Sequence, residues 1–328
     1  MNPVRVGVVG AGALGYHHVR LLRQMPEFRL SGFVELRPER AAQVSAELDV
    51  PSYSNLDTLL DDVDAVTIVV PTPRHFVVAS KALERGKHVL IEKPITATVE
   101  EADELLAIAA RTGAIIQTGH VERFNRAVRA ALPYVSHPRF IESDRLAPFN
   151  VRGSDVAVVL DLMIHDIDLI LTLVNSGAES IAAVGIPVLT QTVDIANARI
   201  TFESGAVANI TASRISRDRV RKVRIFQPSG YLSLDLGAGT GDFFRLRKTG
   251  DLQALVASGV TPDLADFVER IVLTAPEGEP LKLEFESFAA ALNATAPLVV
   301  SGAAGRRALE VALRIVSDIE RNAPSLRA

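Results

Sequence analysis

A glycine-rich turn near the start of the chain is the clearest chemical signal in the sequence. An apolar run at residues 4–9 leads into Gly10-Ala11-Gly12-Ala13-Leu14-Gly15, and a helical pattern follows. Gly10 allows a tight bend, Gly12 lets the backbone approach a pyrophosphate, and Gly15 lets helix and strand pack closely. The pattern predicts a dinucleotide-binding site, with a structural turn that binds no ligand as the alternative.

Two further contacts of the dinucleotide can be placed. Its pyrophosphate would accept hydrogen bonds at the helix start, where Ala13 and Leu14 lie. Glu35, at the end of the second predicted strand, would accept hydrogen bonds from the adenosine ribose. Its charge would repel a 2′-phosphate, which favours NAD over NADP. Arg37 and Arg40 leave NADP open, because either guanidinium could pair with that phosphate or be solvated.

Two polar segments follow the third and fourth predicted strands. The first includes Thr72, Pro73 and His75, and the second begins with Glu92 and Lys93. Ligands of open α/β sheets bind at the carboxyl ends of strands, so these residues are predicted to line the cofactor site. Lys93 is the predicted proton acceptor, because a positively charged nicotinamide nearby would favour its neutral amine. The alternative is an ordinary surface lysine.

An apolar helix predicted at residues 154–174 carries Asp161, His165 and Asp168 at i, i+4 and i+7. This spacing puts the three on one helix face, where buried acids need partners such as substrate hydroxyls, Lys93 or a metal. We predict a substrate site there and no metal, because no third ligand lies at motif spacing. A satisfied core histidine is the alternative for His165.

The segment at residues 119–125 follows the fifth predicted strand and lies where the first domain is expected to end. Its side chains His120, Arg123 and Asn125 could face cofactor or substrate, or could bridge the two domains. We include all three among the predicted substrate-binding residues.

The first 120 residues alternate short β-branched runs with helical patterns, which is typical of parallel strands joined by crossover helices. The predicted strands are residues 4–9, 29–34, 65–70, 88–91 and 114–117. The predicted helices are residues 18–25, 38–48, 56–60, 76–85 and 99–112. These elements predict an α/β fold with a doubly wound parallel Rossmann sheet in residues 1–120.

Residues 121–328 have a different pattern, with the helix at 154–174 followed by successive strand-like runs. The predicted strands are residues 181–189, 196–203, 206–214, 220–227 and 231–235. Residues 237–259 are predicted to be a loop, and helical patterns occupy 285–295 and 303–319. We predict an α+β domain on an open, mostly antiparallel sheet, for substrate binding and oligomerisation. The last helix, within 303–322, could pack back on the first domain.

Composition limits the possible partners. The 328-residue chain is 48% hydrophobic and 23% charged, as in soluble globular proteins. A net charge of −4 gives no broad attraction to nucleic acid or anionic membrane. The basic cluster at residues 214–224 is local and fits a solvated strand pair with its turn.

The sequence has no cysteine, which excludes disulfides, thiolate metal sites and cysteine nucleophiles. It shows no signal-peptide pattern and no apolar run of about 18 residues. We therefore expect a cytoplasmic protein.

The glycine motif, Thr72-Pro73-Arg74-His75, Glu92-Lys93-Pro94 and Asp161-x-x-x-His165-Asp166 together resemble the glucose–fructose oxidoreductase, inositol dehydrogenase and MocA family. The resemblance runs along nearly the whole chain. It implies hydride transfer between a sugar or cyclitol carbon and a nicotinamide cofactor. It also implies a homodimer or homotetramer formed through the second sheet, and a peptide bond before Pro94 that is often cis. The family's catalytic trio corresponds to Lys93, Asp161 and His165.

A narrower resemblance, carried by residues 119–125 and 162–168, is to the UDP-N-acetylglucosamine 3-dehydrogenase members of that family. It implies oxidation at C3 of a nucleotide-sugar by NAD, with Lys93 or His165 taking the hydroxyl proton. Three alternatives stay open. They are an inositol or free-sugar dehydrogenase, a glycoside-cleaving enzyme that retains its NAD, and a non-catalytic sensor of NAD and sugar.

Overall fold

The computed structural model describes residues 3–150, 153, 156–247 and 267–322. The chain divides into two compact units. Unit 1 comprises Met1–Val121 and Glu279–Glu310, and unit 2 comprises Glu122–Gly278 and Val311–Ala328.

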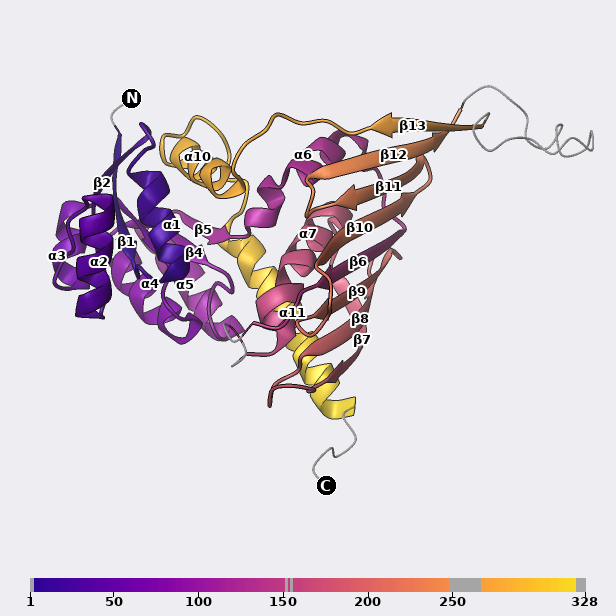
Figure 1. The fold of residues 1–328 in the computed structure, drawn as a ribbon, viewed down its shortest axis with the longest axis horizontal. Coiled ribbons are helices and arrows are strands. Elements are labelled where there is room, and N and C mark those ends of the chain that lie inside the picture. Colours follow the sequence, from indigo (N-terminus) through magenta and orange to yellow (C-terminus); the bar gives the residue numbers. More distant parts are fainter. Residues whose placement is uncertain (1–2, 151–152, 154–155, 248–266, 323–328) are drawn as a thin grey trace, which may run out of the picture. The chain divides into compact units, whose positions relative to one another are not determined.

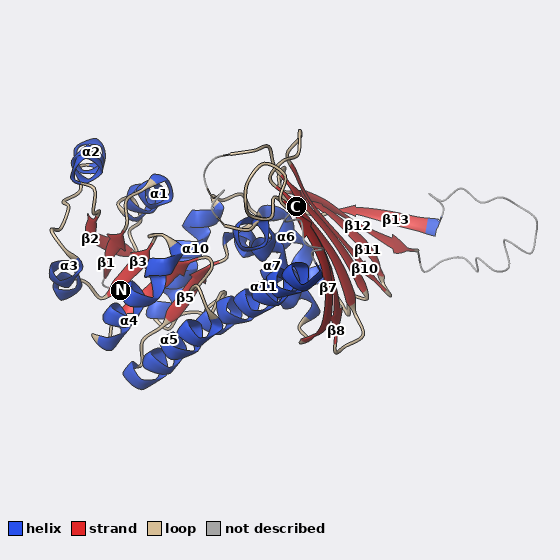
Figure 2. Ribbon diagram, turned by 90° about the horizontal axis from the view of Figure 1, so that it is seen from below, coloured by secondary structure: helices blue, strands red, loops and turns tan. Residues whose placement is uncertain are grey.

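Unit 1 is built on a five-stranded parallel sheet with helices on both faces (Figures 1 and 2). The strand order is β2-β1-β3-β4-β5, with β1 Val4–Val9, β2 Phe28–Val34, β3 Ala65–Ile68, β4 His88–Glu92 and β5 Ile116–Gly119. The helices are α1 Ala13–Leu22, α2 Pro38–Leu48, α3 Leu56–Asp62, α4 His75–Glu84, α5 Val99–Thr112 and α10 Pro280–Leu292. The predicted doubly wound sheet is confirmed.

Local sequence explains several of these elements. All four residues of β3 are buried, as expected for a strand covered on both faces. Helix α5 starts with a capping box, in which the Thr98 side chain accepts from the Glu101 N–H and the Glu101 carboxylate accepts from the Thr98 N–H. Phe285 and Phe288 of α10 join the core formed by α1, β1 and β2.

Unit 2 is built on an eight-stranded sheet whose order is β13-β12-β11-β10-β6-β9-β8-β7. The strands are β6 Phe140–Leu146, β7 Ala178–Ile186, β8 Ile195–Phe202, β9 Val207–Ser213, β10 Val220–Gln227, β11 Gly230–Asp235, β12 Thr240–Leu246 and β13 Val268–Val272. Strands β6 and β9 pair in parallel, and the other pairs are antiparallel. The predicted open, mostly antiparallel sheet is therefore confirmed.

Helices cover one face of this sheet (Figure 1). They include α6 Arg126–Ala131 and α7 Ile164–Val174, which a π-helical turn at Val159–Met163 precedes. The last helix, α11 Gly302–Asn322, contributes its first nine residues to unit 1 and the rest to unit 2. In unit 1, Arg306 pairs with Asp103 at 2.8 Å, and in unit 2 Asp318 accepts from the Ala183 N–H at 2.7 Å.

Three sequence predictions are corrected. The first helix begins at Ala13, not at residue 18, because it starts directly after the glycine turn. The helix predicted from residue 154 begins at Val159, and residues 154–155 lie outside the described part of the chain. The loop predicted at 237–259 contains strand β12, while its residues 248–259 are not described.

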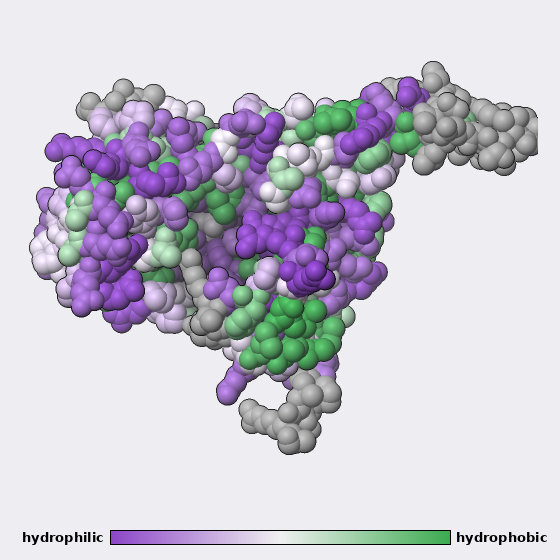
Figure 3. All heavy atoms as spheres, viewed as in Figure 1, coloured by the Kyte–Doolittle hydropathy of each residue, from purple (hydrophilic) through white to green (hydrophobic). Residues whose placement is uncertain are grey.

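The face of the sheet opposite the helices carries a row of aromatic side chains. Phe140, Phe226, Tyr231 and Phe244 stack in turn across four strands, with ring centroids 5.7, 5.5 and 4.7 Å apart. At the β7 edge, Val184, Ile186, Val188 and Leu189 are each about half exposed. Figure 3 shows a hydrophobic patch over the part of unit 2 that Figure 1 labels α11 and β7.

Candidate active site

The glycine turn of unit 1 has the geometry that its sequence predicts. Gly10 has a φ of +94°, and a Cβ there would lie 2.6 Å from the Val69 carbonyl oxygen. A Cβ on Gly15 would lie 2.0 Å from the Gly10 carbonyl oxygen, so only glycine allows this approach. Gly12 caps α1, and a Cβ there would meet only the Arg37 guanidinium, at 3.8 Å. The open space at Gly12 is what a pyrophosphate on the helix start requires.

Glu35 lies against this turn. Its carboxylate accepts from the Ala11 N–H at 3.1 Å and pairs with Arg37 at 3.0 Å. Burial alone would raise the pKa of Glu35, but the bonds from Arg37 and from the Ala11 N–H outweigh it and hold the pKa below its usual range. The carboxylate is thus charged at neutral pH, as a ribose-binding acid must be.

Arg37 and Arg40, the two possible partners of an NADP 2′-phosphate, both have hydrogen-bond partners within the protein. Arg37 pairs with Glu35, and Arg40 donates to the carbonyl oxygens of Ala11 and Gly12 at 2.9 and 3.3 Å. Arg40 therefore stabilises the glycine turn through two backbone carbonyl oxygens. Arg37 is thus paired with Glu35, and Arg40 with the backbone of the glycine turn.

The ends of β3 and β4 are joined by His75. Its Nδ1 lies 2.8 Å from the Pro94 carbonyl oxygen and its Nε2 lies 2.8 Å from the Val70 carbonyl oxygen. The ring is buried, and burial lowers the pKa of His75 in spite of these two carbonyls. Thr72 and Pro73 form a short 3-10 turn just before it. His75, predicted to bind cofactor, therefore holds the two strand ends together.

Strand β4 ends at Glu92, and Lys93 is the next residue. The Glu92 carboxylate lies 3.2 Å from Nε2 of His18, a fully buried residue of α1. Burial would raise the pKa of Glu92, but the His18 ring and the Lys93 charge outweigh it and lower the pKa. Lys93 follows directly, and its peptide bond to Pro94 is cis, as the family resemblance implies.

In unit 2, the π-helical turn carries Asp161, and His165 lies in the first turn of α7. Gly153, with a φ of +78°, packs against the acid, since a Cβ there would lie 2.9 Å from Oδ2 of Asp161. The sequence pattern predicts Asp161 and His165 on one helix, but it does not indicate the irregular turn that carries Asp161. Such π-helical turns are frequent at functional sites.

The other acids of this helix have arginine partners. Asp168 pairs with Arg123 through two hydrogen bonds of 2.7 and 2.5 Å. Asp166 pairs with Arg145 of β6 at 2.6 Å, and Arg145 also pairs with Glu122 at 2.9 Å. Sequence reasoning missed Arg145 and Glu122, although the need of buried acids for partners pointed to an arginine nearby.

The remaining predicted substrate residues are divided between the two units. Asn125 is buried and caps α6, accepting from the Ala127 N–H while its amide donates to Glu122 and to the Leu236 carbonyl. His120 is buried in unit 1. Unit 1 thus brings together the glycine turn, Glu35 and the ends of β3 and β4, while unit 2 holds Asp161 and His165.

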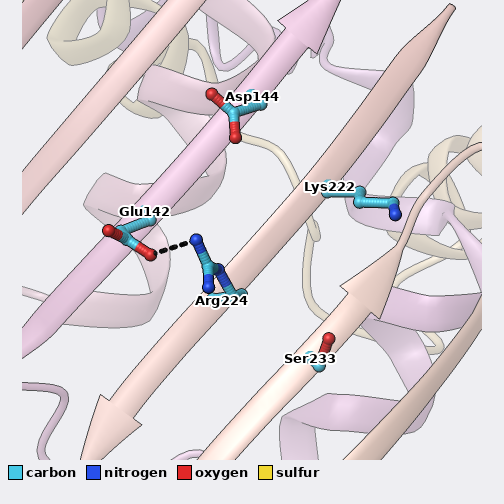
Figure 4. Close-up of a pocket in the computed structure, with 5 residues that line it drawn as sticks. All are labelled: Glu142, Asp144, Lys222, Arg224 and Ser233. Carbon is cyan, nitrogen blue, oxygen red and sulfur yellow. Dashed lines mark ion pairs between the residues drawn. The ribbon is translucent and has the colours of Figure 1, made fainter.

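A separate hollow of about 310 Å³ lies on the face of the unit 2 sheet opposite the helices. Figure 4 shows its lining, with Glu142 and Asp144 on β6, Lys222 and Arg224 on β10, and Ser233 on β11. None of these is a predicted site residue.

Neither a metal-binding cluster nor a membrane-spanning helix occurs among the described residues. No group of three or more His, Asp or Glu side chains there is arranged to hold a metal ion. Within the same residues, no helix has the length and apolar character needed to cross a membrane.

A parallel sheet with this glycine turn, followed by an open α+β sheet, defines a two-part oxidoreductase with a Rossmann dinucleotide-binding domain. The chain belongs to the GFO/IDH/MocA family. The model described as an oxidoreductase family with an NAD-binding Rossmann fold matches residues 4–120, and the GFO/IDH/MocA C-terminal domain matches residues 126–233. The predictions of the family, of an oxidoreductase and of NAD as cofactor are confirmed.

Similarity to individual proteins supports this family assignment. The chain is 38% identical to the UDP-N-acetylglucosamine 3-dehydrogenase of Acidithiobacillus ferrooxidans, over 98% of both chains. It is 32% identical to the scyllo-inositol 2-dehydrogenase (NAD(+)) of Bacillus subtilis, over 66% of this chain and 68% of that protein. A solved structure of the Acidithiobacillus enzyme aligns with a TM-score of 0.87 at 36% identity, over 98% of this chain and 99% of that one.

Proposed function

We propose that the protein oxidises the C3 hydroxyl of UDP-N-acetylglucosamine with NAD. The observation that carries this proposal is the 38% identity, over 98% of both chains, to an enzyme named for that reaction. The match spans both units, so it includes the part of the chain that should bind the sugar.

The cofactor would be held by unit 1. We assign the pyrophosphate to Gly10, Gly12, Ala13, Leu14 and Gly15, and the ribose to Glu35. Thr72, Pro73, Glu92 and Lys93 would border the nicotinamide end, with His75 supporting them. Bound NAD supplies the hydride acceptor.

The residues that move the proton would be Lys93 and His165. Hydride can leave a ring carbon only if the hydroxyl proton has an acceptor, and an uncharged amine or imidazole can take it. We assign Lys93 to the reacting hydroxyl and His165 as its partner or the alternative base. Asp161 would orient the histidine or hold a neighbouring hydroxyl.

The residues assigned to substrate are Lys93, Asp161, His165 and His120. Arg123 and Asn125 have structural contacts of their own, with Asp168 and with the start of α6. They would therefore support the sugar site by holding its helices.

We also propose the roles of the two parts of the chain. Residues 1–120 would bind the dinucleotide, while residues 121–328 would bind substrate and form a cytoplasmic homodimer or homotetramer through the sheet. The stacked aromatic row of Phe140, Phe226, Tyr231 and Phe244 supports this, since aromatic side chains are enriched at interfaces.

The test is to mix the purified protein and NAD with a panel of UDP-sugars, free sugars and inositols, and to follow NADH by absorbance. NADH formation only with UDP-N-acetylglucosamine would support the proposal. The similarity to an inositol dehydrogenase makes scyllo-inositol the second candidate, and reaction only with that cyclitol would reject the nucleotide-sugar.

A further inference from the structure

Two guanidinium groups and two carboxylates meet on the helix-covered face of the unit 2 sheet. Arg145 of β6 and Arg221 of β10 are register partners, so both point to the face that α7 covers. Arg145 lies between Asp166 and Glu122. The ion pair that Arg221 forms with the described residues is with Glu122, and its Nη1 is 3.7 Å from Oε1 of that acid.

The carboxylates of this cluster are largely used by Arg145. That side chain is 4% exposed and donates hydrogen bonds to both acids, which raises its pKa above the ordinary value although burial opposes this. Arg221 has to share Glu122 with it at a longer distance. Its own side chain is 40% exposed, so the guanidinium faces solvent at the edge of the cluster.

A third arginine adds positive charge at the same edge. Arg219 precedes β10 in the turn after β9, is exposed, and forms no ion pair with any residue that the structure describes. Burial first, and then the charges of Arg145 and Arg219, lower the pKa of Arg221 below its ordinary value. Positive charge is therefore in excess here, which an anion would relieve.

The cluster connects to the candidate active site through contacts within unit 2. Arg221 approaches Glu122, Glu122 pairs with Arg145, and Arg145 pairs with Asp166. Asp166 is the residue after His165. Three successive ion pairs therefore connect an anion at Arg221 to the helix that carries the proposed proton acceptor.

From this arrangement we infer that Arg219 and Arg221 bind the diphosphate of a nucleotide-sugar substrate, while the sugar reaches the helix of His165. Guanidinium groups suit this ligand, because their planar donors match phosphate oxygens in pairs. The inference rests on the proposed function for the sugar, but the diphosphate site can be tested without turnover.

The probe is UDP, titrated by calorimetry into the full-length protein with saturating NAD, so that the dinucleotide site is already filled. Arg219→Gln removes a side chain without a partner in the described structure, and Arg221→Gln removes the one beside Glu122. We expect each to weaken UDP binding at least about tenfold, the usual loss for one charge-assisted contact. Arg224→Gln is the matched control, because Arg224 lies on the same strand but pairs with Glu142 on the opposite face.

The outcomes separate the two proposals. The diphosphate site is supported if Arg219→Gln and Arg221→Gln both weaken UDP binding while Arg224→Gln does not. If UDP-N-acetylglucosamine is then not oxidised, only the proposed reaction is rejected. The diphosphate site is overturned if the affinity of Arg219→Gln for UDP equals that of the unmodified protein. It is also overturned if the unmodified protein does not bind UDP. Oxidation of UDP-N-acetylglucosamine in either of those cases would leave the proposed function standing.

Discussion

Arg145 and Asp166 form a two-pronged buried ion pair, with Nε 2.6 Å from Oδ2 and Nη2 3.0 Å from Oδ1. Their side chains are 4% and 2% exposed. Removing one partner of such a pair leaves the other charge uncompensated, at a cost of about 3–5 kcal/mol. We expect Arg145→Met to lower the free energy of unfolding by that amount in urea denaturation.

The matched control is Arg224→Met, which removes an exposed pair with Glu142 from the other face of the sheet. Its loss should be at most about 1 kcal/mol. Equal losses in the two variants would show that burial does not decide the strength of these pairs.

Lys93→Met tests the proposed proton acceptor. The variant should bind NAD normally, because the glycine turn and Glu35 are intact, while turnover falls at least about a hundredfold for want of a base. Fluorescence titration gives the NAD affinity, and NADH absorbance gives the rate. Lys81→Met, at a lysine of α4 that pairs with Asp57, is the control. Near-full activity of Lys93→Met would remove this residue from the mechanism.

Glu35→Ser tests the choice of cofactor. Loss of the carboxylate removes both the ribose acceptor and the repulsion of a 2′-phosphate, and it releases Arg37 from its ion pair. We expect the ratio of kcat/KM for NADP over NAD to rise at least about tenfold. Glu39→Ser, at an exposed acid in the first turn of α2, should leave that ratio unchanged.

His75 is expected to act through the position of Lys93. His75→Phe removes the ring nitrogens that face the Val70 and Pro94 carbonyls, so kcat should fall at least about tenfold while the KM for NAD changes little. His75→Gln restores an amide donor and should recover part of kcat. Equal kcat values for the two variants would argue against a hydrogen-bonding role.

Asp194 should control stability in acid. Burial would raise the pKa of its carboxylate, but backbone N–H groups of Thr190, Val188 and Leu189 and the Thr190 hydroxyl lower it to about 2. A lowered pKa stabilises the fold above the ordinary value of about 4, and this contribution is lost as pH falls toward 2.

Asp194→Asn should therefore unfold at lower temperature than the unmodified protein at pH 7, and the gap should close between pH 4 and pH 2. Thermal unfolding across that pH range measures it. Asp49→Asn is the control, since that side chain is 94% exposed. A gap that stays constant with pH would mean that Asp194 acts through its shape rather than its charge.

Much of unit 1 could be predicted from the sequence, because its signals are local. Buried runs such as residues 65–68 indicate strands, and the glycine turn marks the end of β1, although the helix after it was predicted five residues too late. In unit 2 the strand at Val220–Gln227 was predicted with its observed bounds, because buried and exposed residues alternate along it.

Strand β6 was missed for a physical reason. Its buried positions include Ser143 and Arg145, so the sequence Phe140-Ile-Glu-Ser-Asp-Arg-Leu146 lacks the apolar alternation that marks a strand. Arg145 tolerates burial only because Asp166 and Glu122 neutralise it. Partners that lie so far away in the sequence leave no local signal. Neither the central strand β6 nor the ion pairs of Arg145 could therefore be predicted from the sequence.

The location of β6 also bears on the order in which the chain can assemble. Residues 140–146 leave the ribosome early, yet both neighbours of the strand, β9 and β10, begin more than sixty residues later. Contacts so distant along the chain form slowly, because a long loop must close first. We expect nascent chains that end before residue 207 to lack the central pairings of this sheet and to require a chaperone until β9 and β10 have been synthesised.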